Sequence, residues 1–200
     1  MKIVVIGATG TIGTAVAGAL AKRHEVVRVG HQKGDHRVDL ASPDSIKKLF
    51  REVAPFDAVI CAAGLAKFGP LKELTDEDFE LGFSNKLMGQ INVVRLGLSQ
   101  IADYGSFTLT SGVLSLEPMP GSAAISPVNA GIEGFVRAAA LELPRGVRIN
   151  AVSPPWVKET LVALGMDPSH GMPAASVAKA YAESVEGTKN GLVIDARAFA

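Results

Sequence analysis

Only one cysteine, Cys61, occurs among the 200 residues, so no intrachain disulfide can form and the composition fits the reducing cytoplasm. An excess of charge of one sign is also lacking, because 20 basic and 20 acidic residues give a formal net charge of zero. This balance offers no electrostatic footprint for nucleic acid or an anionic membrane, and neither partner is expected. No segment approaches the run of about 18 apolar residues that a transmembrane helix requires.

Signals for secretion and for metal binding are absent as well. The apolar run at residues 3–6 is too short for the core of a signal peptide. The four histidines are scattered and lack carboxylates at a metal-binding spacing, so no metal is predicted. The sequence therefore predicts a cytoplasmic globular protein without a bound metal.

A regular alternation of short β-branched runs and longer helical patterns extends along the whole chain. The predicted strands are nearly unbroken apolar runs, which is typical of strands buried on both faces. They lie at residues 3–6, 26–29, 58–61, 107–110, 147–152 and 192–194, with a weaker strand at 37–40. The predicted helices lie at about 11–22, 43–53, 75–102, 122–142, 158–164 and 173–185.

This alternation predicts one α/β domain over residues 1–200, a Rossmann-type, doubly wound fold. Right-handed crossovers favour a seven-stranded parallel sheet of order 3-2-1-4-5-6-7 with helices on both faces. Two helix starts carry clear signals, an N-cap and proline at Ser42-Pro43 and a capping box at residues 75–78. The ligand is expected at the carboxyl ends of the strands, beneath the Pro- and Gly-rich segment 154–173.

A glycine-rich turn, G-A-T-G-T-I-G at residues 7–13, follows the first predicted strand and opens the first helix. Its glycines permit a tight turn and close approach of the backbone to a pyrophosphate, whose charge is stabilised at a helix N-terminus. The turn therefore predicts dinucleotide binding. The expected contacts are Gly7, Thr9, Gly10, Thr11, Ile12 and Gly13.

With this turn, three further segments give the chain a resemblance to the short-chain dehydrogenase/reductase family over nearly its whole length. C-A-A-G at 61–64 resembles the family's N-N-A-G segment, residues 131–143 resemble the helix after its catalytic motif, and S-P-P-W-V at 153–157 resembles its P-G-x-V turn. The resemblance implies reversible hydride transfer between a nicotinamide cofactor and a small carbonyl or alcohol. The cofactor contacts it implies in these segments are Ala62, Ala63, Gly64, Pro154 and Val157.

Two polar residues match catalytic positions of the family. Asn85, in F-S-N-K-L-M-G, resembles the asparagine that holds a proton-relay water. Ser111, in F-T-L-T-S-G, resembles the serine that binds the substrate carbonyl, although a strand-end cap is an equal interpretation of it. The resemblance also implies a homodimer or homotetramer, associated through the two long helices at about 75–102 and 122–142.

The family's Y-x-x-x-K pair is absent. Counting back from E-G-F at 133–135 places the tyrosine at Ile125 and the lysine at Asn129, which could still bond the nicotinamide ribose. The tyrosines lie at 104 and 181, and no lysine lies between Lys86 and Lys158, so the pair is interpreted as missing and not displaced. A positioned general acid contributes about 10²–10⁴-fold to a rate.

Two hypotheses follow from this gap. One is an oxidoreductase with a degenerate site that turns over ordinary ketones slowly. The other is a non-catalytic nucleotide-binding module, a sensor or an assembly partner. His170 is the one group in segment 154–173 whose ordinary pKa suits proton transfer, although a loop histidine is more often simply solvated.

The cofactor preference depends on the end of the second strand, V-G-H-Q-K at 29–33. It lacks the acidic residue that holds the ribose 2′-hydroxyl of NAD, and Asp35 comes several residues late. His31 and Lys33, together with Thr9, favour a 2′-phosphate, so NADP(H) is predicted and NAD(H) is the alternative. Asp39 resembles the aspartate that contacts the adenine, with Leu40 beside it, while a turn residue is an equal interpretation of Asp39.

Overall fold

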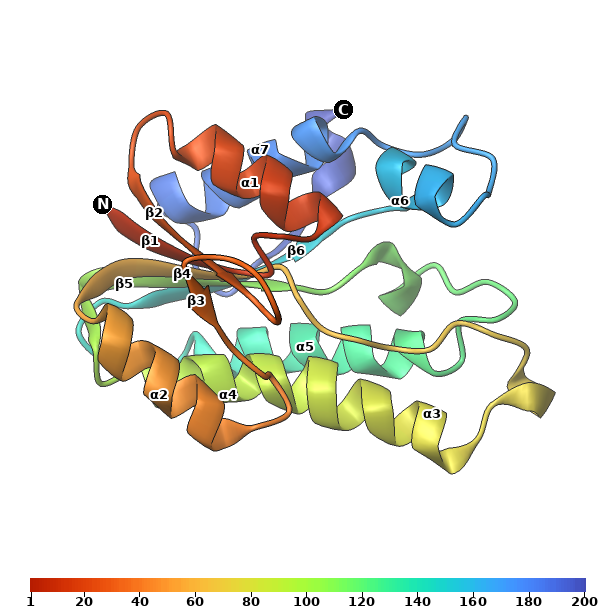
Figure 1. Cartoon of the computed structure of the whole chain (residues 1–200), viewed down its shortest axis with the longest axis horizontal. Helices are drawn as coiled ribbons and strands as arrows, with labels where there is room; N and C mark the ends of the chain where they lie inside the picture. Colours follow the sequence, from red (N-terminus) through yellow and green to blue (C-terminus); the bar gives the residue numbers. More distant parts are fainter.

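A seven-stranded parallel sheet forms the centre of the computed structural model, which describes all residues 1–200 (Figure 1). The strands follow the order β3-β2-β1-β4-β5-β6-β7 and every neighbouring pair is parallel, so the predicted doubly wound order is confirmed. Their bounds are β1 (Lys2–Ile6), β2 (Glu25–Gly30), β3 (His36–Arg37), β4 (Phe56–Cys61), β5 (Ile101–Thr110), β6 (Arg148–Ser153) and β7 (Val193–Asp195).

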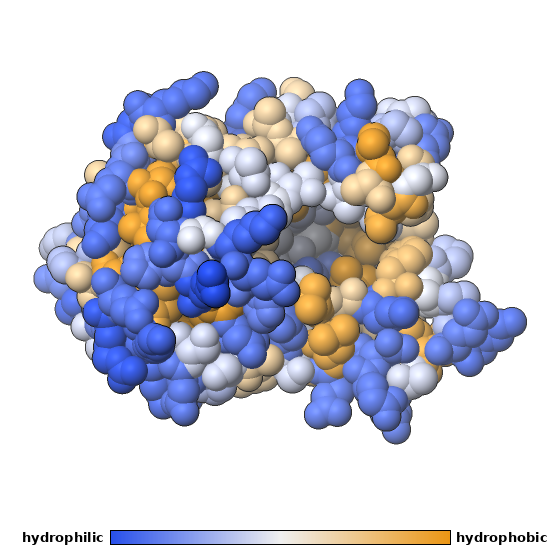
Figure 2. Space-filling view, viewed as in Figure 1, coloured by the Kyte–Doolittle hydropathy of each residue, from blue (hydrophilic) through white to orange (hydrophobic).

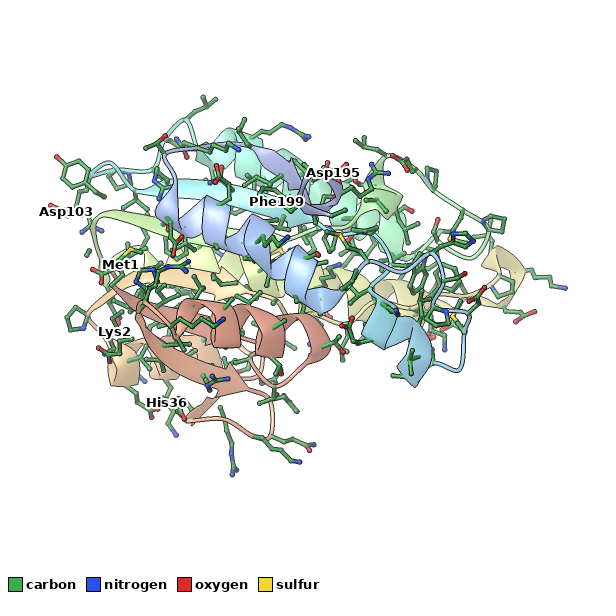
Figure 3. All side chains as sticks on the ribbon, turned by 90° about the horizontal axis from the view of Figure 1, so that it is seen from above. Met1, Lys2, His36, Asp103, Asp195 and Phe199 are labelled. Atoms are coloured by element: carbon green, nitrogen blue, oxygen red, sulfur yellow. The ribbon has the colours of Figure 1, made fainter.

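Helices cover both faces of the sheet. In Figure 1, α1, α6 and α7 lie above it and α2, α3, α4 and α5 below it, and Figure 3 shows α1 and α7 packed side by side. Their bounds are α1 (Thr11–Leu20), α2 (Pro43–Val53), α3 (Asp76–Leu81), α4 (Met88–Gly97), α5 (Ile125–Ala139), α6 (Lys158–Ala163) and α7 (Ala174–Glu186). None of these helices combines the length and the apolar character needed to cross a bilayer.

Strand β1 illustrates why the strands are continuous apolar runs. Val4 and Ile6 belong to the core beneath the sheet, with α2, α4 and α5, whereas Ile3 and Val5 belong to the core above it, with α1 and α7. Successive side chains of a strand point to opposite faces, so a strand covered on both sides must be apolar at every position. With both faces covered, a ligand can reach the sheet at the ends of its strands.

Both predicted helix starts are confirmed. The Ser42 hydroxyl accepts a hydrogen bond from the Ser45 amide at 3.2 Å, with Pro43 at the first helical position of α2. At the start of α3, Thr75 and Asp78 form a reciprocal capping box.

The weak strand predicted at 37–40 is wrong beyond Arg37. Strand β3 contains only His36 and Arg37, because the Asp39 amide donates to the Ser45 hydroxyl at 3.0 Å and the Ala41 amide donates to the Asp39 carboxylate at 2.9 Å. These bonds turn the chain towards α2 and away from the sheet.

The single long helix predicted at 75–102 is also wrong, because it is divided into three parts. A π-helical turn, Gly82–Leu87, separates α3 from α4, and α4 ends at Gly97 so that β5 can begin at Ile101. Tyr104 accordingly lies within β5 and not before it, with a φ of 60°. The π turn matters for function because it positions Asn85 and Lys86.

Candidate active site

A cavity of about 320 Å³ lies where β4, β5 and β6 end, beside the start of α1. Figure 2 shows the hollow, with apolar residues to the right of and below its opening and hydrophilic residues to the left. The wall combines the start of α1, the turns after β4, β5 and β6, the π turn, the start of α5 and one residue of α6. Its residues are Ile12, Ala62, Ala63, Gly64, Lys86, Thr110, Ser111, Gly112, Val113, Leu114, Ile125, Asn129, Pro154, Pro155, Trp156, Val157 and Thr160.

The predicted site residues divide into two groups around this cavity. Those of the glycine turn and of the end of β2 lie outside its wall, with the exception of Ile12. The predicted residues in the wall are Ile12, Ala62, Ala63, Gly64, Ser111, Asn129, Pro154 and Val157. His170 is exposed and does not line the cavity, so the structure does not bring it to this site.

The amino end of α1 is open to an anion. Helix α1 has no side-chain cap at Gly10 and no acidic residue in its first turn, unlike α2 and α3, which are both capped. Thr9, Gly10 and Thr11 are exposed, and a Cβ added at Gly10 would meet nothing closer than 3.5 Å. The uncapped amide groups and the positive end of the helix dipole fit a pyrophosphate.

Gly7 and Gly13 are required by the fold of the turn itself. Gly7 has a φ of 87°, and a Cβ at Gly13 would lie 2.0 Å from the Gly7 carbonyl oxygen. The glycine pattern that predicts a nucleotide site is therefore partly a packing requirement of this strand-to-helix turn.

Exposed basic side chains follow the end of β2. His31 and Lys33 are exposed and form no ion pair, while the Asp35 carboxylate accepts a hydrogen bond from the Arg28 amide at 2.9 Å. Thr9 lies beside them, since its hydroxyl would be 2.8 Å from a Cβ at Gly30. The Asp35 carboxylate is engaged through one oxygen by the backbone of β2, and the two basic groups suit a phosphate.

The two residues predicted near the adenine, Asp39 and Leu40, lie in the turn before α2. The Asp39 carboxylate accepts from the Ala41 amide, as described above, which is its predicted role as a turn residue. Leu40 is buried against Gly89 in the lower core.

Ser111 lies at the end of β5 and is buried in the cavity wall, 3% exposed. Its hydroxyl donates to Glu133 of α5 at 2.6 Å, and Ser115 donates to the same carboxylate oxygen at 2.5 Å. The other oxygen of Glu133 pairs with Arg137 at 3.3 Å. Glu133 thus fixes the orientation of the Ser111 hydroxyl, a role that is not predicted from the sequence.

Asn85 does not enter the cavity wall. Its side-chain oxygen accepts a hydrogen bond from the Leu65 amide at 2.8 Å, which fastens the segment after β4 to the π turn.

Lys86, the next residue, enters the wall instead. Its Nζ donates to the Asn129 side-chain oxygen at 2.7 Å and to the Ser111 carbonyl oxygen at 3.3 Å. It is 8% exposed, and burial lowers the pKa of its ammonium to about 8. It is the single ionisable side chain among the residues that line the cavity.

Lys86 is not predicted from the sequence, because the wider π turn changes which side chains share a face and a 3.6-residue period cannot predict that change. The signal that could have identified it is its position directly after Asn85, within a matched motif.

Comparison with known proteins identifies the family. Residues 7–189 match the family model described as enoyl-(acyl carrier protein) reductase, which covers most of the chain. The chain belongs to the short-chain dehydrogenase/reductase family. Its resemblance to this family, stated from sequence motifs, is thereby confirmed.

Similar short-chain dehydrogenases/reductases include reductases of fungi. A hydroxynaphthalene reductase of Aspergillus fumigatus is 33% identical over 138 residues, which cover 66% of this chain and 50% of that protein. A versicolorin reductase of Emericella nidulans is 27% identical over 179 residues, 77% of this chain and 68% of that protein. The match thus spans about half the length of the first relative.

Solved structures resemble the whole chain. The protein lin1944 of Listeria innocua has a TM-score of 0.93 at 43% identity, with 98% of each chain covered. A small-chain dehydrogenase in complex with NADPH has a TM-score of 0.85 at 26% identity, covering 98% of this chain and 95% of that one.

Proposed function

We propose that this short-chain dehydrogenase/reductase binds NADP(H) and transfers hydride to or from a small carbonyl or alcohol, without the family's tyrosine. One observation carries the proposal: a single cavity joins Ile12, at the start of α1, to the Ser111 wall. A cofactor held at α1 would therefore reach the polar groups at the end of β5. Bound NADPH would supply the hydride at its nicotinamide ring.

Residues of the chain would hold the cofactor in three places. Uncapped amides at the start of α1 would take the pyrophosphate, and His31 and Lys33 would take the 2′-phosphate. Pro154 and Val157, in the cavity wall, would contact the nicotinamide. The family's NADPH-bound relative supports this choice of cofactor over NAD(H).

The substrate end of the cavity is largely apolar. Val113, Leu114, Ile125 and Trp156 contribute apolar surface, and Trp156 packs edge-on against Phe68, with ring centroids 5.6 Å apart. Such walls exclude water from a reacting carbonyl and strengthen the few polar contacts present. A carbonyl compound with an apolar body fits this wall, and the names of the fungal reductases support reduction as the reaction class.

Calorimetry with NADPH and NADH, followed by NADPH oxidation over a panel of aliphatic and aromatic ketones, tests the proposal. Tight NADPH binding with turnover of at least one ketone is the expected result. Tight binding without turnover of any substrate would favour the non-catalytic module, and no binding of either nucleotide would reject both hypotheses.

A further inference from the structure

Lys86 is a buried cation without a counter-ion. Its two hydrogen-bond partners, the Asn129 side chain and the Ser111 carbonyl, are both neutral, and no Asp or Glu forms an ion pair with it. Burial of an unpaired charge is unfavourable, and buried lysines are usually paired. A purely structural role would be served at lower cost by an apolar side chain in this wall.

The surrounding backbone leaves room for the lysine because residue 64 is a glycine and has no side chain. Gly64 has a φ of 139°, and a Cβ there would lie 2.5 Å from Cγ of Lys86. The π turn and Gly64 together bring the ammonium through the wall to the cavity.

The ammonium keeps one hydrogen-bond donor for a ligand. A lysine ammonium has three donors, and two of them are used by Asn129 and the Ser111 carbonyl. The hydroxyl groups at the end of β5 are less suitable as donors to a ligand, because they are already hydrogen-bonded to the protein. The Ser111 hydroxyl donates to Glu133, and the Thr110 hydroxyl bonds the Cys61 carbonyl at 2.6 Å and Tyr181 at 2.7 Å.

We propose that Lys86 is the catalytic acid of this enzyme, donating its third N–H to the carbonyl oxygen of the substrate and then its proton. The proposal rests on the function proposed above. As the carbonyl carbon accepts a hydride with its electron pair from the reduced nicotinamide, the C=O π pair takes the proton from Nζ. The C–H bond of the reduced nicotinamide, the C=O π bond and the Nζ–H bond would break, one C–H and one O–H bond would form, and the neutral amine would regain a proton from water. Alcohol oxidation reverses these steps, with the neutral amine as the base.

The titratable groups that face Lys86 leave it free to titrate near neutrality. Burial raises the pKa of the Cys61 thiol, at the end of β4, to about 12, so this group stays neutral. Glu133, on α5, reaches this wall through Ser111 and has its charge offset by Arg137. Because the pKa of Lys86 is lowered to about 8, the ammonium is both present at pH 7 and able to release its proton.

The test compares the wild type with Lys86→Met, which keeps the length of the side chain and removes its charge. Lys72→Met, at an exposed lysine without an ion pair, is the matched control. We expect Lys86→Met to lower kcat for ketone reduction by about 10²–10⁴-fold, the contribution of a positioned acid. NADPH affinity, measured by calorimetry, should change far less, and Lys72→Met should leave both unchanged.

The pH profile separates an acid from a merely structural lysine. The protonated form is the active one for reduction, so wild-type kcat should be constant below pH 8 and fall above it, while alcohol oxidation should rise. An NMR titration of isotope-labelled lysine side chains, in the absence of cofactor, should show one lysine whose pKa is lowered to about 8. This readout decides the matter even where Lys86→Met fails to fold.

Three outcomes would overturn the proposal. Ketone reduction that survives Lys86→Met within a few-fold would reject Lys86 and leave the proposed function intact. A kcat that does not fall at alkaline pH, or an NMR titration in which no lysine has a lowered pKa, would do the same. Absence of hydride transfer in the wild type would reject the proposed function and Lys86 together.

Discussion

At the level of single residues, the contact with Lys86 explains why a neutral asparagine stands at position 129. The amide oxygen of Asn129 accepts a hydrogen bond from the ammonium at 2.7 Å, in the cavity wall. A lysine at 129 would place a second ammonium beside the first and repel it. The predicted replacement of the family's lysine by Asn129 is therefore consistent with the presence of Lys86 in the same wall.

Asn129→Asp should move the pH profile in a defined direction. The substitution is nearly isosteric and places a negative charge beside Lys86, which favours the ammonium and raises its pKa. The alkaline fall in kcat for ketone reduction should then shift from about pH 8 to higher pH. Asn85→Asp, which keeps the bond to the Leu65 amide and lies outside the cavity wall, is the control and should shift the profile less. An unchanged profile in Asn129→Asp would contradict this assignment.

The preference between NADPH and NADH also depends on single residues. We expect a lower Kd for NADPH than for NADH, because the exposed Lys33 follows β2 where NAD enzymes carry an acid. Lys33→Ser should weaken NADPH binding by up to about 5-fold, the size of an exposed ion pair, and leave NADH binding unchanged. Lys22→Ser, at an exposed lysine beyond the other end of α1, should affect neither nucleotide. Calorimetry that finds equal affinities for the two nucleotides would contradict the preference.

Some of these residues could be found from the sequence and others could not. Ser111 and Asn129 follow from motif matching and lie in the cavity wall. Asn85 matches a motif equally well, yet its side chain serves the Leu65 amide. The roles of Lys86 and Glu133 depend on their contacts with Ser111, from which they are separated by 25 and 22 residues in the sequence. No local pattern predicts contacts over such separations.

At the scale of elements, the start of α1 allows nucleotide binding to be separated from folding. An aspartate at Gly10 would cap the helix and occupy with negative charge the place of a pyrophosphate. Gly10 has a φ of −88° and open space around a Cβ, so the side chain fits.

We therefore predict that Gly10→Asp keeps or slightly raises the free energy of unfolding and strongly weakens NADPH binding. Gly10→Ala, which adds only a methyl group, is the matched control and should bind more tightly than Gly10→Asp. Denaturant unfolding and calorimetry on both variants measure the two effects. Unimpaired NADPH binding by Gly10→Asp would place the nucleotide elsewhere.

The elements themselves are largely predictable, because their signals are local. Buried strands such as β1 read as apolar runs, and the caps of α2 and α3 are visible as Ser42-Pro43 and Thr75 to Asp78. The end of β3 and the π turn are not predictable in this way. The first depends on a bond from Asp39 to Ser45, and the second departs from the helical period used to recognise helices.

At the scale of the whole molecule, α5 presents a face suited to self-association. Ala130, Gly134 and Ala138 are exposed and spaced four residues apart, so they share one side of the helix. Small residues allow a second helix to approach closely, as the predicted homodimer or homotetramer requires.

Gly134→Gln should disrupt that association. A Cβ at Gly134 meets nothing within 4 Å, so the larger side chain fits the protomer and would block a partner helix. We expect light scattering to show an oligomer for the wild type and a smaller mass for Gly134→Gln. Gly18→Gln, at an equally open and exposed position on α1, should keep the wild-type mass. A monomeric wild type would end this prediction.

Deuterium transfer is a direct test of the proposed hydride transfer in a cavity whose wall contains no tyrosine. Wild-type protein would be incubated with NADPH deuterated at the reactive nicotinamide carbon and with each ketone of the panel, and the products analysed by mass spectrometry. We expect an alcohol with one deuterium on the former carbonyl carbon, formed by the wild type and far more slowly by Gly10→Asp. Full NADPH binding with no deuterated product from any ketone would contradict hydride transfer in this cavity.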